Sequence, residues 1–464
     1  HYFGTAGVSA DYYGRVASRL GPRIGVPEGD AFVVLMTQGT AGDQHWMDYG
    51  APRREGYTID QYADEMVEIV ARVHQETSFR SAVAIRMRED HVTLPRRVPD
   101  ASRLSWAEAE LAALGDAPAA TRPQVYAREQ IYLRDEPVRD LALQVLCLDE
   151  LGIRVTPTEV FGLSSLAMKA VSPLPASFTV TLANGAEGYV PPAEQFAFGG
   201  YVTWPARTAG LAEMAEATIS RTLTTMLEEV SGQPRREPVY EPDAYAGEVL
   251  ATDPLVYVPL HERGGDRAAD VTGHGRDGRY EGRIAYHLDG VVARAPYFAG
   301  GHVTVDLQGL GATWSLACWA WPGFADAPPC SVRTLLTVRH ADVSLVLSIS
   351  GNVGEANHLV LDTDARRATS RQALTPRSWH HVALVRDLDA LYLYVDGVHD
   401  TSLACPGGGD ADDGYVRIGS DMTGARGFEG KVCEVSLHRG VLTGAVIDRM
   451  RRAAASGRTR RERA

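Results

Sequence analysis

The spacing of hydrophobic and polar residues changes near the middle of the chain. In the first half, apolar residues at helical spacing predict helices at 9–20, 58–74, 105–114 and 208–230. Compact or alternating apolar runs predict strands at 31–36, 125–135 and 141–157. Helices interleaved with strands are typical of an α/β unit, so we expect residues 1–231 to form an α/β domain with a mixed sheet.

The second half has the pattern of an all-β domain. Short runs of alternating apolar and polar residues recur roughly every ten residues and are separated by Gly or Asp turns. We therefore expect an antiparallel sandwich over residues 254–450. Residues 232–253 combine three prolines with many charges and no periodicity, which predicts a linker. Residues 451–464 form a basic tail that we expect to fray.

Composition narrows the range of partners. The chain of 464 residues has a formal net charge of -13, so we expect no nucleic-acid partner. No apolar run approaches the ~18 residues that a membrane span requires, so no span is expected. Five cysteines are present, and their spacing is compatible with disulfides and equally with buried free thiols in the second half, at Cys318, Cys330, Cys405 and Cys433.

Two side chains capable of chemistry follow short strands in the first half. Glu159 comes after the strand GIRV, and Tyr189 comes after the strand FTVTLAN. A short helix predicted between them, FGLSSLAMKAV, can bring both residues to one edge of a sheet, where the sites of α/β proteins tend to lie. The alternative is that Glu159 is a solvated carboxylate in a loop.

Several ordered motifs in this half carry a family resemblance. The segments PTEVFGLSSLAMK, LANGAEGYVPP and FGGYVTWPA resemble the N-terminal domain of neutral, non-lysosomal ceramidases. The resemblance implies a zinc-dependent hydrolase in which Glu159 and Tyr189 bind the metal, with Tyr201 as the second choice for the tyrosine. It also implies a zinc-binding histidine in the segment HYFGTAGVSADYYG, which corresponds to His1. Because this motif starts at the first residue of the chain, we expect that further sequence precedes it.

The same resemblance is interrupted at the nucleophile. Ceramidases have a loop resembling GDxSPN, whereas this chain lacks the serine and has Gly42, Asp43, Gln44 and His45. His45 is then a general base or a structural residue, and both interpretations stay open. We expect Asp43 to orient the backbone or a metal ligand. The implied substrate is a small or lipid-like molecule with an amide or ester bond.

The second half resembles a concanavalin A-like, LamG-like jelly roll. The matching segments are DVTGHGRDGRYEG, WSLACWAW, WHHVALVRD, LYLYVDG and FEGKVCEVSLHRG. This resemblance implies glycan or Ca²⁺ binding and a location outside the cytoplasm. The candidate calcium ligands, for which turn formation is the alternative, are Asp270, Asp277 and Asp421. The candidate sugar platforms, for which core packing is favoured at the second and third, are Trp314, Trp319, Trp321 and Trp379.

Two functions compete on this basis. The first is a secreted zinc-dependent hydrolase with an appended lectin-like module. The second is a non-catalytic carbohydrate-binding or adhesion protein whose hydrolase domain is degenerate. The missing serine favours the second function, whereas the presence of Glu159, Tyr189 and His1 favours the first.

Overall fold

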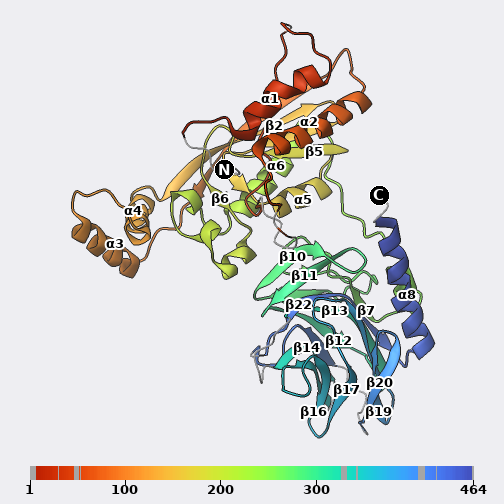
Figure 1. Ribbon diagram of the computed structural model, residues 1–464. Helices are drawn as coiled ribbons and strands as arrows, with labels where there is room; N and C mark the ends of the chain where they lie inside the picture. Colours follow the sequence, from red (N-terminus) through yellow and green to blue (C-terminus); the bar gives the residue numbers. More distant parts are fainter. Residues whose placement is uncertain are drawn as a thin grey trace. The chain divides into compact units, whose positions relative to one another are not determined.

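The chain forms two compact units (Figure 1). The computed structural model describes residues 7–29, 31–45, 52, 54–324, 332–340, 343–405, 413–424 and 426–461. The first unit comprises residues 1–193 and 199–237, and the second comprises residues 194–198 and 238–464. The boundary near residue 237 lies close to the predicted end of the α/β domain at residue 231.

A four-stranded mixed sheet is the centre of the first unit. Its order is β1-β2-β3-β5, and the strands are β1 (Ile85–Pro95), β2 (Val138–Leu148), β3 (Leu151–Val155) and β5 (Ala176–Val180). β1, β2 and β3 are antiparallel neighbours, whereas β5 is parallel to β3. The strand region predicted at 141–157 is confirmed as β2 and β3. The sequence pattern gives no indication of β1, because IRMREDHVTLP is too polar to show a buried face.

Helix α6 (Ala215–Ser231) covers one face of this sheet. Its apolar stripe, which includes Leu223 and Leu227, packs against alternate residues of β2, namely Leu141, Leu143, Val145 and Cys147. The opposite face of the sheet is more open and displays the apolar side chains of Ile85, Met87 and Phe178. The sheet is therefore packed on one side by a helix that the sequence pattern predicts.

Helices α1 (Asp11–Arg23) and α2 (Ile59–Glu76) pack against each other. They bury between them a small cluster formed by Val16, Leu20, Ala63 and Val67. The predicted apolar stripe of α2 is only partly buried, because Ile69 and Val73 are exposed. The helix begins at Ile59, and the predicted first residue, Thr58, is its N-cap and forms a capping box with Gln61.

The prediction of a buried strand at residues 31–36 is wrong. This segment is irregular, and the side chains of Val33 and Leu35 are 77% and 85% exposed. An apolar run becomes a strand only where a neighbouring strand offers hydrogen bonds, and none of the described strands pairs with this segment.

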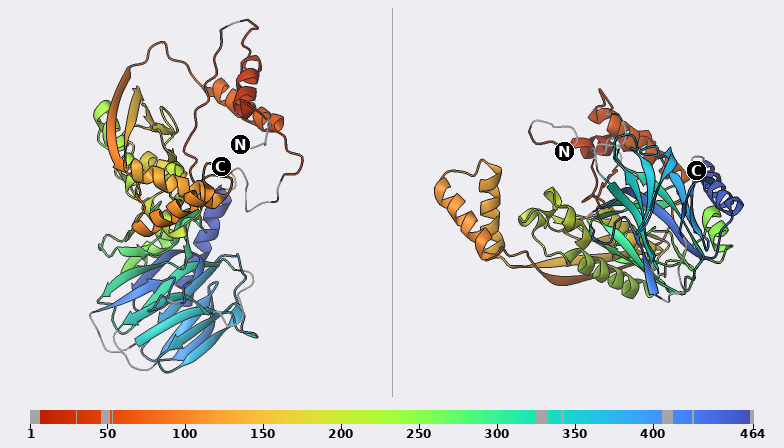
Figure 2. Two further views of the ribbon diagram at one scale, coloured as in Figure 1. Left: turned by 90° about the vertical axis from the view of Figure 1, so that its left-hand side faces the viewer. Right: turned by 90° about the horizontal axis from the view of Figure 1, so that it is seen from below.

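Helices α3 (Ala101–Leu114) and α4 (Arg122–Asp135) lie side by side as a hairpin (Figure 2). The strand predicted at 125–135 is therefore wrong. α4 forms because Gln124 accepts a hydrogen bond from the backbone N–H of Thr121 (3.1 Å) and a proline lies in its first turn. α3 begins at Ala101 rather than at the predicted Ser105, and Asp100 is its N-cap residue.

The second unit is a β-sandwich of two eight-stranded sheets. One sheet has the order β10-β11-β22-β13-β18-β19-β20, with β7 paired to β22, and the other has the order β17-β16-β15-β14-β21-β12-β9-β8. Inward side chains of both sheets form a common core that includes Phe298, Trp314, Leu347 and Leu437. The prediction of an all-β jelly roll for the second half is thus confirmed.

The strands of the sandwich are short and closely spaced along the chain. Their bounds are β7 (Val256–Val258), β8 (Arg267–Ala268), β9 (Gly278–Glu281), β10 (Ile284–Asp289), β11 (Arg294–Ala299), β12 (His302–Gln308), β13 (Trp314–Pro322), β14 (Val332–His340), β15 (Val343–Ser350), β16 (His358–Thr363), β17 (Arg367–Ala373), β18 (His380–Arg386), β19 (Ala390–Val395), β20 (Val398–Ala404), β21 (Asp413–Ile418) and β22 (Glu429–Arg439). Neighbouring strands of the sandwich pair in antiparallel fashion, as in β13 with β18 and β14 with β15.

Two helices, α7 (Ala244–Leu250) and α8 (Gly444–Arg461), cover the outer face of the sheet that contains β13. α7 lies inside the predicted linker 232–253, so that prediction is wrong at its C-terminal end. The physical reason is that Tyr245 and Val249 are fully buried against Trp319 and Cys433. The predicted fraying tail is also wrong in part, because α8 continues to Arg461.

The four cysteines within the described residues are free thiols. Cys147, Cys318 and Cys433 are buried, so the interpretation as buried thiols holds for these three. Cys330 lies outside the described residues. In the part of the chain that the structure describes, no helix combines the length and apolarity needed to cross a bilayer.

Candidate functional site

Glu159 and Tyr189 lie opposite each other on two short parallel strands of the first unit. β4 (Glu159–Val160) pairs with β6 (Tyr189–Val190), and the register places Glu159 directly beside Tyr189. The chain leaves β4 through α5 (Gly162–Ala170) and returns along β5 before it reaches β6. The backbone N–H of Glu159 donates to the carbonyl of Gly188 (2.7 Å), which fixes the start of the pairing. The structure thus brings these two predicted site residues together.

The protonation of this pair is governed by burial. Burial raises the pKa of Glu159, and a hydrogen bond with the Tyr189 hydroxyl opposes that rise. Burial and the neighbouring Glu159 charge raise the pKa of Tyr189 to about 12. At neutral pH, Tyr189 is therefore a neutral phenol whose O–H is available to the Glu159 carboxyl group.

The Gly42–Asp43 loop packs directly on this strand pair. The N–H of Gly42 donates to the carbonyl of Val160 (3.0 Å), and a Cβ at Gly42 would lie 2.7 Å from the carbonyl oxygen of Glu159. Asp43 accepts hydrogen bonds from the backbone N–H groups of Gly162 (2.6 Å) and Leu163 (3.3 Å), at the N-terminus of α5. Asp43 therefore orients the backbone beside Glu159.

The remaining predicted residues are placed differently. His45 lies two residues after Asp43 and has an exposed side chain, and His1 lies outside the described residues. Among the residues that the structure describes, no group of three or more His, Cys, Asp or Glu side chains is arranged to hold a metal ion. Glu159 and Tyr189 therefore bring two oxygen-bearing side chains together in this part of the first unit.

Tyr189 is also the first member of an aromatic stack. Its ring lies 5.6 Å from that of Tyr201, which lies 6.0 Å from Trp204, and Trp204 lies 5.5 Å from Tyr126 on α4. Each contact is edge-to-face, the geometry that aromatic rings prefer. Tyr201, the second-choice zinc ligand, belongs to the 3-10 helix η2 (Tyr201–Thr203) and is 57% exposed. The stack leads from the Glu159–Tyr189 pair to a cavity.

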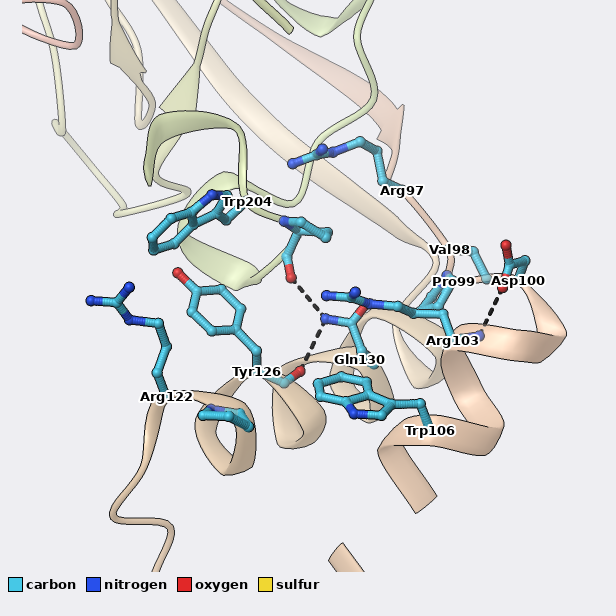
Figure 3. A pocket seen from close by; sticks show the side chains of 12 residues that line it. Arg97, Val98, Pro99, Asp100, Arg103, Trp106, Arg122, Tyr126, Gln130 and Trp204 are labelled. Carbon is cyan, nitrogen blue, oxygen red and sulfur yellow. Dashed lines mark hydrogen bonds between the residues drawn. The ribbon is translucent and has the colours of Figure 1, made fainter. Parts of the chain in front are cut away.

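This cavity has a volume of about 730 Å³ and lies between the α3–α4 hairpin and the segment after η2 (Figure 3). Trp106 projects from α3, Tyr126 and Gln130 project from α4, and Trp204 closes the opposite side. Gln130 is 1% exposed, and its Nε2 donates to the carbonyls of Pro205 (2.8 Å) and Tyr126 (3.0 Å). The wall is therefore held in place by a buried hydrogen-bonding side chain.

Sequence reasoning missed this cavity because it took α4 for a strand. The missed signal is the helical spacing of Arg122, Tyr126 and Gln130, which places all three on one face of α4. Thr121 and Gln124, at capping-box spacing, mark where that helix begins.

The second unit contains a buried polar cluster that the sequence pattern did not reveal. Glu434 on β22 is fully buried, accepts a hydrogen bond from the hydroxyl of Tyr257, and pairs with Nε2 of His261 (2.7 Å). Burial lowers the pKa of His261, but the hydrogen bond and charge of Glu434 outweigh it and raise that pKa overall. Glu434 also has a positive φ of 58°, so its backbone conformation is held by the surrounding fold.

The predicted calcium ligands are engaged as turn formers. Asp270 accepts hydrogen bonds from the backbone N–H groups of Tyr257, Thr272 and Arg276 (3.1 Å each). Asp277 accepts one from the N–H of Asp270 (2.9 Å) and pairs with Arg267. Asp421 accepts from the N–H of Thr423 (3.0 Å). These contacts fit the interpretation of the three residues as turn formers.

The predicted sugar platforms divide into core and partly buried residues. Trp314 and Trp319 are 1% and 7% exposed and belong to the packed core of the second unit. They are therefore closed to a sugar, and the core interpretation holds for Trp319. Trp321 is partly buried beneath the ammonium group of Lys431, which lies 5.0 Å from its ring. Trp379 packs at the edge of the cluster beneath α7 and α8.

Comparison with known proteins identifies part of the second unit. Residues 299–448 match the family model of the concanavalin A-like lectin/glucanases superfamily. The second unit therefore contains a concanavalin A-like jelly-roll domain of the LamG type. No curated protein matches this chain.

Comparison with solved structures finds matches in several kinds of protein. Domain 4 of AbnA, a GH43 extracellular arabinanase from Geobacillus stearothermophilus in complex with arabinotriose, is 19% identical, with a TM-score of 0.34 over 42% of this chain and 96% of that one. The Trypanosoma rangeli sialidase is 18% identical, with a TM-score of 0.33 over 42% of this chain and 32% of that one. The binding domain of botulinum neurotoxin serotype D is 11% identical, with a TM-score of 0.34 over 43% of this chain and 51% of that one.

Proposed function

We propose that this protein binds carbohydrate through the outer face of its jelly roll that is formed by β12, β21 and β14. The observation that carries the proposal is the difference between the two outward faces of the sandwich. One face is covered by α7 and α8, which bury Trp319 and Cys433. The other face carries polar side chains on β12, β21 and β14, where the register aligns Asp306 with Tyr415 and Tyr415 with Arg339.

This row of side chains has the chemistry of a sugar-binding surface. It places a carboxylate, a phenol ring and a guanidinium side by side across three neighbouring strands. Asp306 and Arg339 are exposed and Tyr415 is partly exposed, so all three are accessible. A phenol ring offers an apolar face to the C–H groups of a sugar, and the charged groups offer hydrogen bonds to its hydroxyls. The match to the concanavalin A-like family supports the same proposal.

The test is a glycan array probed with the whole chain, followed by titration of the glycans that bind. We expect Tyr415→Ala and Arg339→Ala each to weaken binding by about tenfold, the equivalent of ~1.4 kcal/mol. Arg294→Ala is the matched control, because Arg294 is an exposed arginine on β11 of the opposite sheet. Binding that survives both substitutions, or an array without any bound glycan, would contradict the proposal.

A second proposal concerns hydrolysis by the first unit, and the specific observation in its favour is the Glu159–Tyr189 pair. We propose that these residues bind zinc together with a histidine beyond the described residues, for which His1 is the candidate. Zinc held there would acidify a bound water and polarise a carbonyl group. Asp43 would hold α5 and the Glu159 strand in register, because it bonds the backbone at Gly162. The expected substrates are amides or esters, including lipid-like ones, outside the cytoplasm.

This second proposal is tested by metal analysis and by assays on amide and ester substrates. We expect zinc to copurify with the protein and Glu159→Ala to remove it. The control is Glu76→Ala, because Glu76 is an exposed carboxylate at the end of α2. If zinc content is the same in Glu159→Ala as in the unaltered protein, the carboxylate is structural and the proposal fails.

A further inference from the structure

The cavity between α3, α4 and Trp204 gathers positive charge above aromatic rings. The guanidinium of Arg103 lies 4.8 Å from the ring centroid of Trp106, and that of Arg122 lies 5.1 Å from the ring of Trp204. Both arginines line the cavity and have exposed side chains. Within the part of the chain that the structure describes, neither forms a salt bridge with a carboxylate.

The acidic side chain in the lining of this cavity, that of Asp100, already accepts hydrogen bonds. Asp100 accepts hydrogen bonds from the backbone N–H of Arg103 (2.8 Å) and from the hydroxyl of Ser102 (2.7 Å), and it begins α3 as its N-cap. The carboxylate of Asp100 is therefore occupied as the N-cap of α3. Nε of Arg103 donates to Gln130 (3.4 Å), which leaves the terminal N–H groups of that guanidinium for a ligand. A guanidinium donates in a planar fork that matches the two oxygens of a carboxylate.

The cavity walls around the two arginines are preformed. The buried Gln130 fixes the backbone at Pro205 and Tyr126, which holds Trp204 and Tyr126 edge-to-face. The guanidinium of Arg97 donates to the carbonyls of Thr203 (2.8 Å) and Ala209, so the segment behind Trp204 is anchored as well. A prebuilt site loses little conformational entropy when it binds.

The size and lining of the cavity define the ligand. A volume of about 730 Å³ accommodates a molecule of one or two rings. The indole rings of Trp106 and Trp204 offer flat apolar surfaces, and they lower the local dielectric constant, which strengthens the attraction between a guanidinium and an anion. We propose that this cavity binds a small ligand in which a carboxylate is attached to a ring.

Two sources of such a ligand share this chemistry. One is a uronic acid residue of an acidic saccharide, and the other is an aromatic acid. The proposal stands apart from glycan binding by the jelly roll and from zinc at Glu159, because it rests on different residues. Trp106 and Trp204 line the cavity, so occupancy is expected to change the tryptophan fluorescence of the chain.

The experiment titrates the whole chain with digalacturonate, with phenylacetate and with lactose, and it follows tryptophan fluorescence and the heat of binding. We expect at least one acid to bind, and the acid that binds identifies the source. We expect Arg103→Gln and Arg122→Gln each to raise its Kd by about tenfold, because each removes one charge-assisted hydrogen-bond donor group. Raising the salt concentration is expected to weaken binding at this exposed rim.

A matched control lies on the same helix. Arg128 on α4 is exposed and does not line the cavity, so Arg128→Gln is expected to leave the Kd unchanged. All three substitutions exchange an exposed arginine for a helix-compatible glutamine, and circular dichroism verifies that each variant is folded. The proposal is overturned if neither acid binds, if lactose binds as tightly as the acids, or if Arg103→Gln and Arg122→Gln both retain the unaltered Kd.

Discussion

Glu159 and Tyr189 occupy directly opposed positions on the parallel strands β4 and β6. The pair lies partly buried beneath the Gly42–Asp43 loop, whose backbone contacts the carbonyl of Val160. Burial raises the pKa of the Glu159 carboxyl group, so its charged form is less stable in the folded protein than in the unfolded chain. Binding of a cation or of a proton to the Glu159 carboxylate would therefore stabilise the folded protein.

This relationship predicts the pH dependence of a Glu159→Gln variant. The folded-state pKa of Glu159 is above its ordinary value of 4.5, so the folded state binds more protons than the unfolded state between the two values. Stability of the unaltered protein therefore falls as pH rises through this interval. A glutamine side chain carries no charge, so the variant is expected to be the more stable protein above the folded-state pKa, and the two are expected to converge in acid.

Urea unfolding with a chelator present, at a series of pH values, measures this difference without a contribution from metal. Glu76→Gln on α2 is the control, since Glu76 is exposed and its substitution is expected to change stability little at any pH. A Glu159→Gln variant that is less stable at neutral pH would show that the negative charge is compensated inside the protein.

The contact of α6 with the sheet predicts a second result. Leu223 is fully buried and packs on the alternating apolar residues of β2. Leu223→Ala is expected to destabilise the first unit by about 2–5 kcal/mol, because it removes buried methyl groups and leaves a cavity. Arg221→Ala on the same helix is the control, because Arg221 is exposed and its loss is expected to cost less than about 0.5 kcal/mol. Denaturant unfolding measures both, and equal costs would contradict the packing described for α6.

The sequence pattern predicted those parts of the fold that one segment determines by itself. The sequence predicted the strand region that contains β2 and the helix that contains α6, and the structure buries Leu143 and Leu223 on one face of each. The pairing of Glu159 with Tyr189 was also accessible, because both follow strands that end at the same edge. The segment at 31–36 shows the limit, since Leu35 is apolar but lacks a strand partner among the described residues.

Features that combine segments far apart in the sequence could not be predicted from the sequence pattern. Glu434 meets Tyr257 across a separation of 177 residues and His261 across 173, and nothing in the sequence of β22 indicates that a carboxylate is tolerated inside it. The cavity beside Trp204 joins three separate segments, and one of them, α4, has too weak an apolar stripe to reveal its helical period. Such sites depend on tertiary pairing, which local periodicity does not encode.

The His261–Glu434 pair predicts a pH dependence for the second unit. The folded-state pKa of His261 is raised above its ordinary value of 6.5, so the charged pair contributes its full stability below that value. This contribution is lost as pH rises through the folded-state pKa, because the imidazole then loses its proton. The melting temperature of the second unit is therefore expected to fall from about pH 6 to about pH 9, and His261→Gln is expected to flatten that fall.

Differential scanning calorimetry over this pH range tests the effect of His261. His399→Gln is the control, since His399 is an exposed histidine on β20 of the same unit. We expect the control to follow the pH profile of the unaltered protein. A His261→Gln profile that runs parallel to the unaltered one would mean that His261 does not carry the pH dependence.

The burial of α7 predicts where the second unit begins as a folding unit. Tyr245 is fully buried, its hydroxyl lies 3.2 Å from Nε2 of His381, and its ring meets that of Trp319 edge-to-face. A fragment that starts at Pro238 keeps this helix, whereas a fragment that starts at Pro254 exposes Trp319 and leaves His381 without its hydroxyl partner. We therefore expect the shorter fragment to be much less stable or to aggregate, because the part of the sheet face that α7 covers becomes exposed.

The single substitution Tyr245→Ala tests the same contact in the whole chain. It is expected to cost the second unit about 3–5 kcal/mol, as for other fully buried aromatic residues. Glu248→Ala on the same helix is the control, because its salt bridge with Arg449 (2.6 Å) is partly exposed and is expected to contribute less than about 1 kcal/mol. Thermal unfolding of the two fragments and the two variants gives the comparison. If the Pro254 fragment melts at the same temperature as the Pro238 fragment, then α7 does not contribute to the stability of the sandwich. The linker would then extend to residue 253, as the composition of that segment predicts.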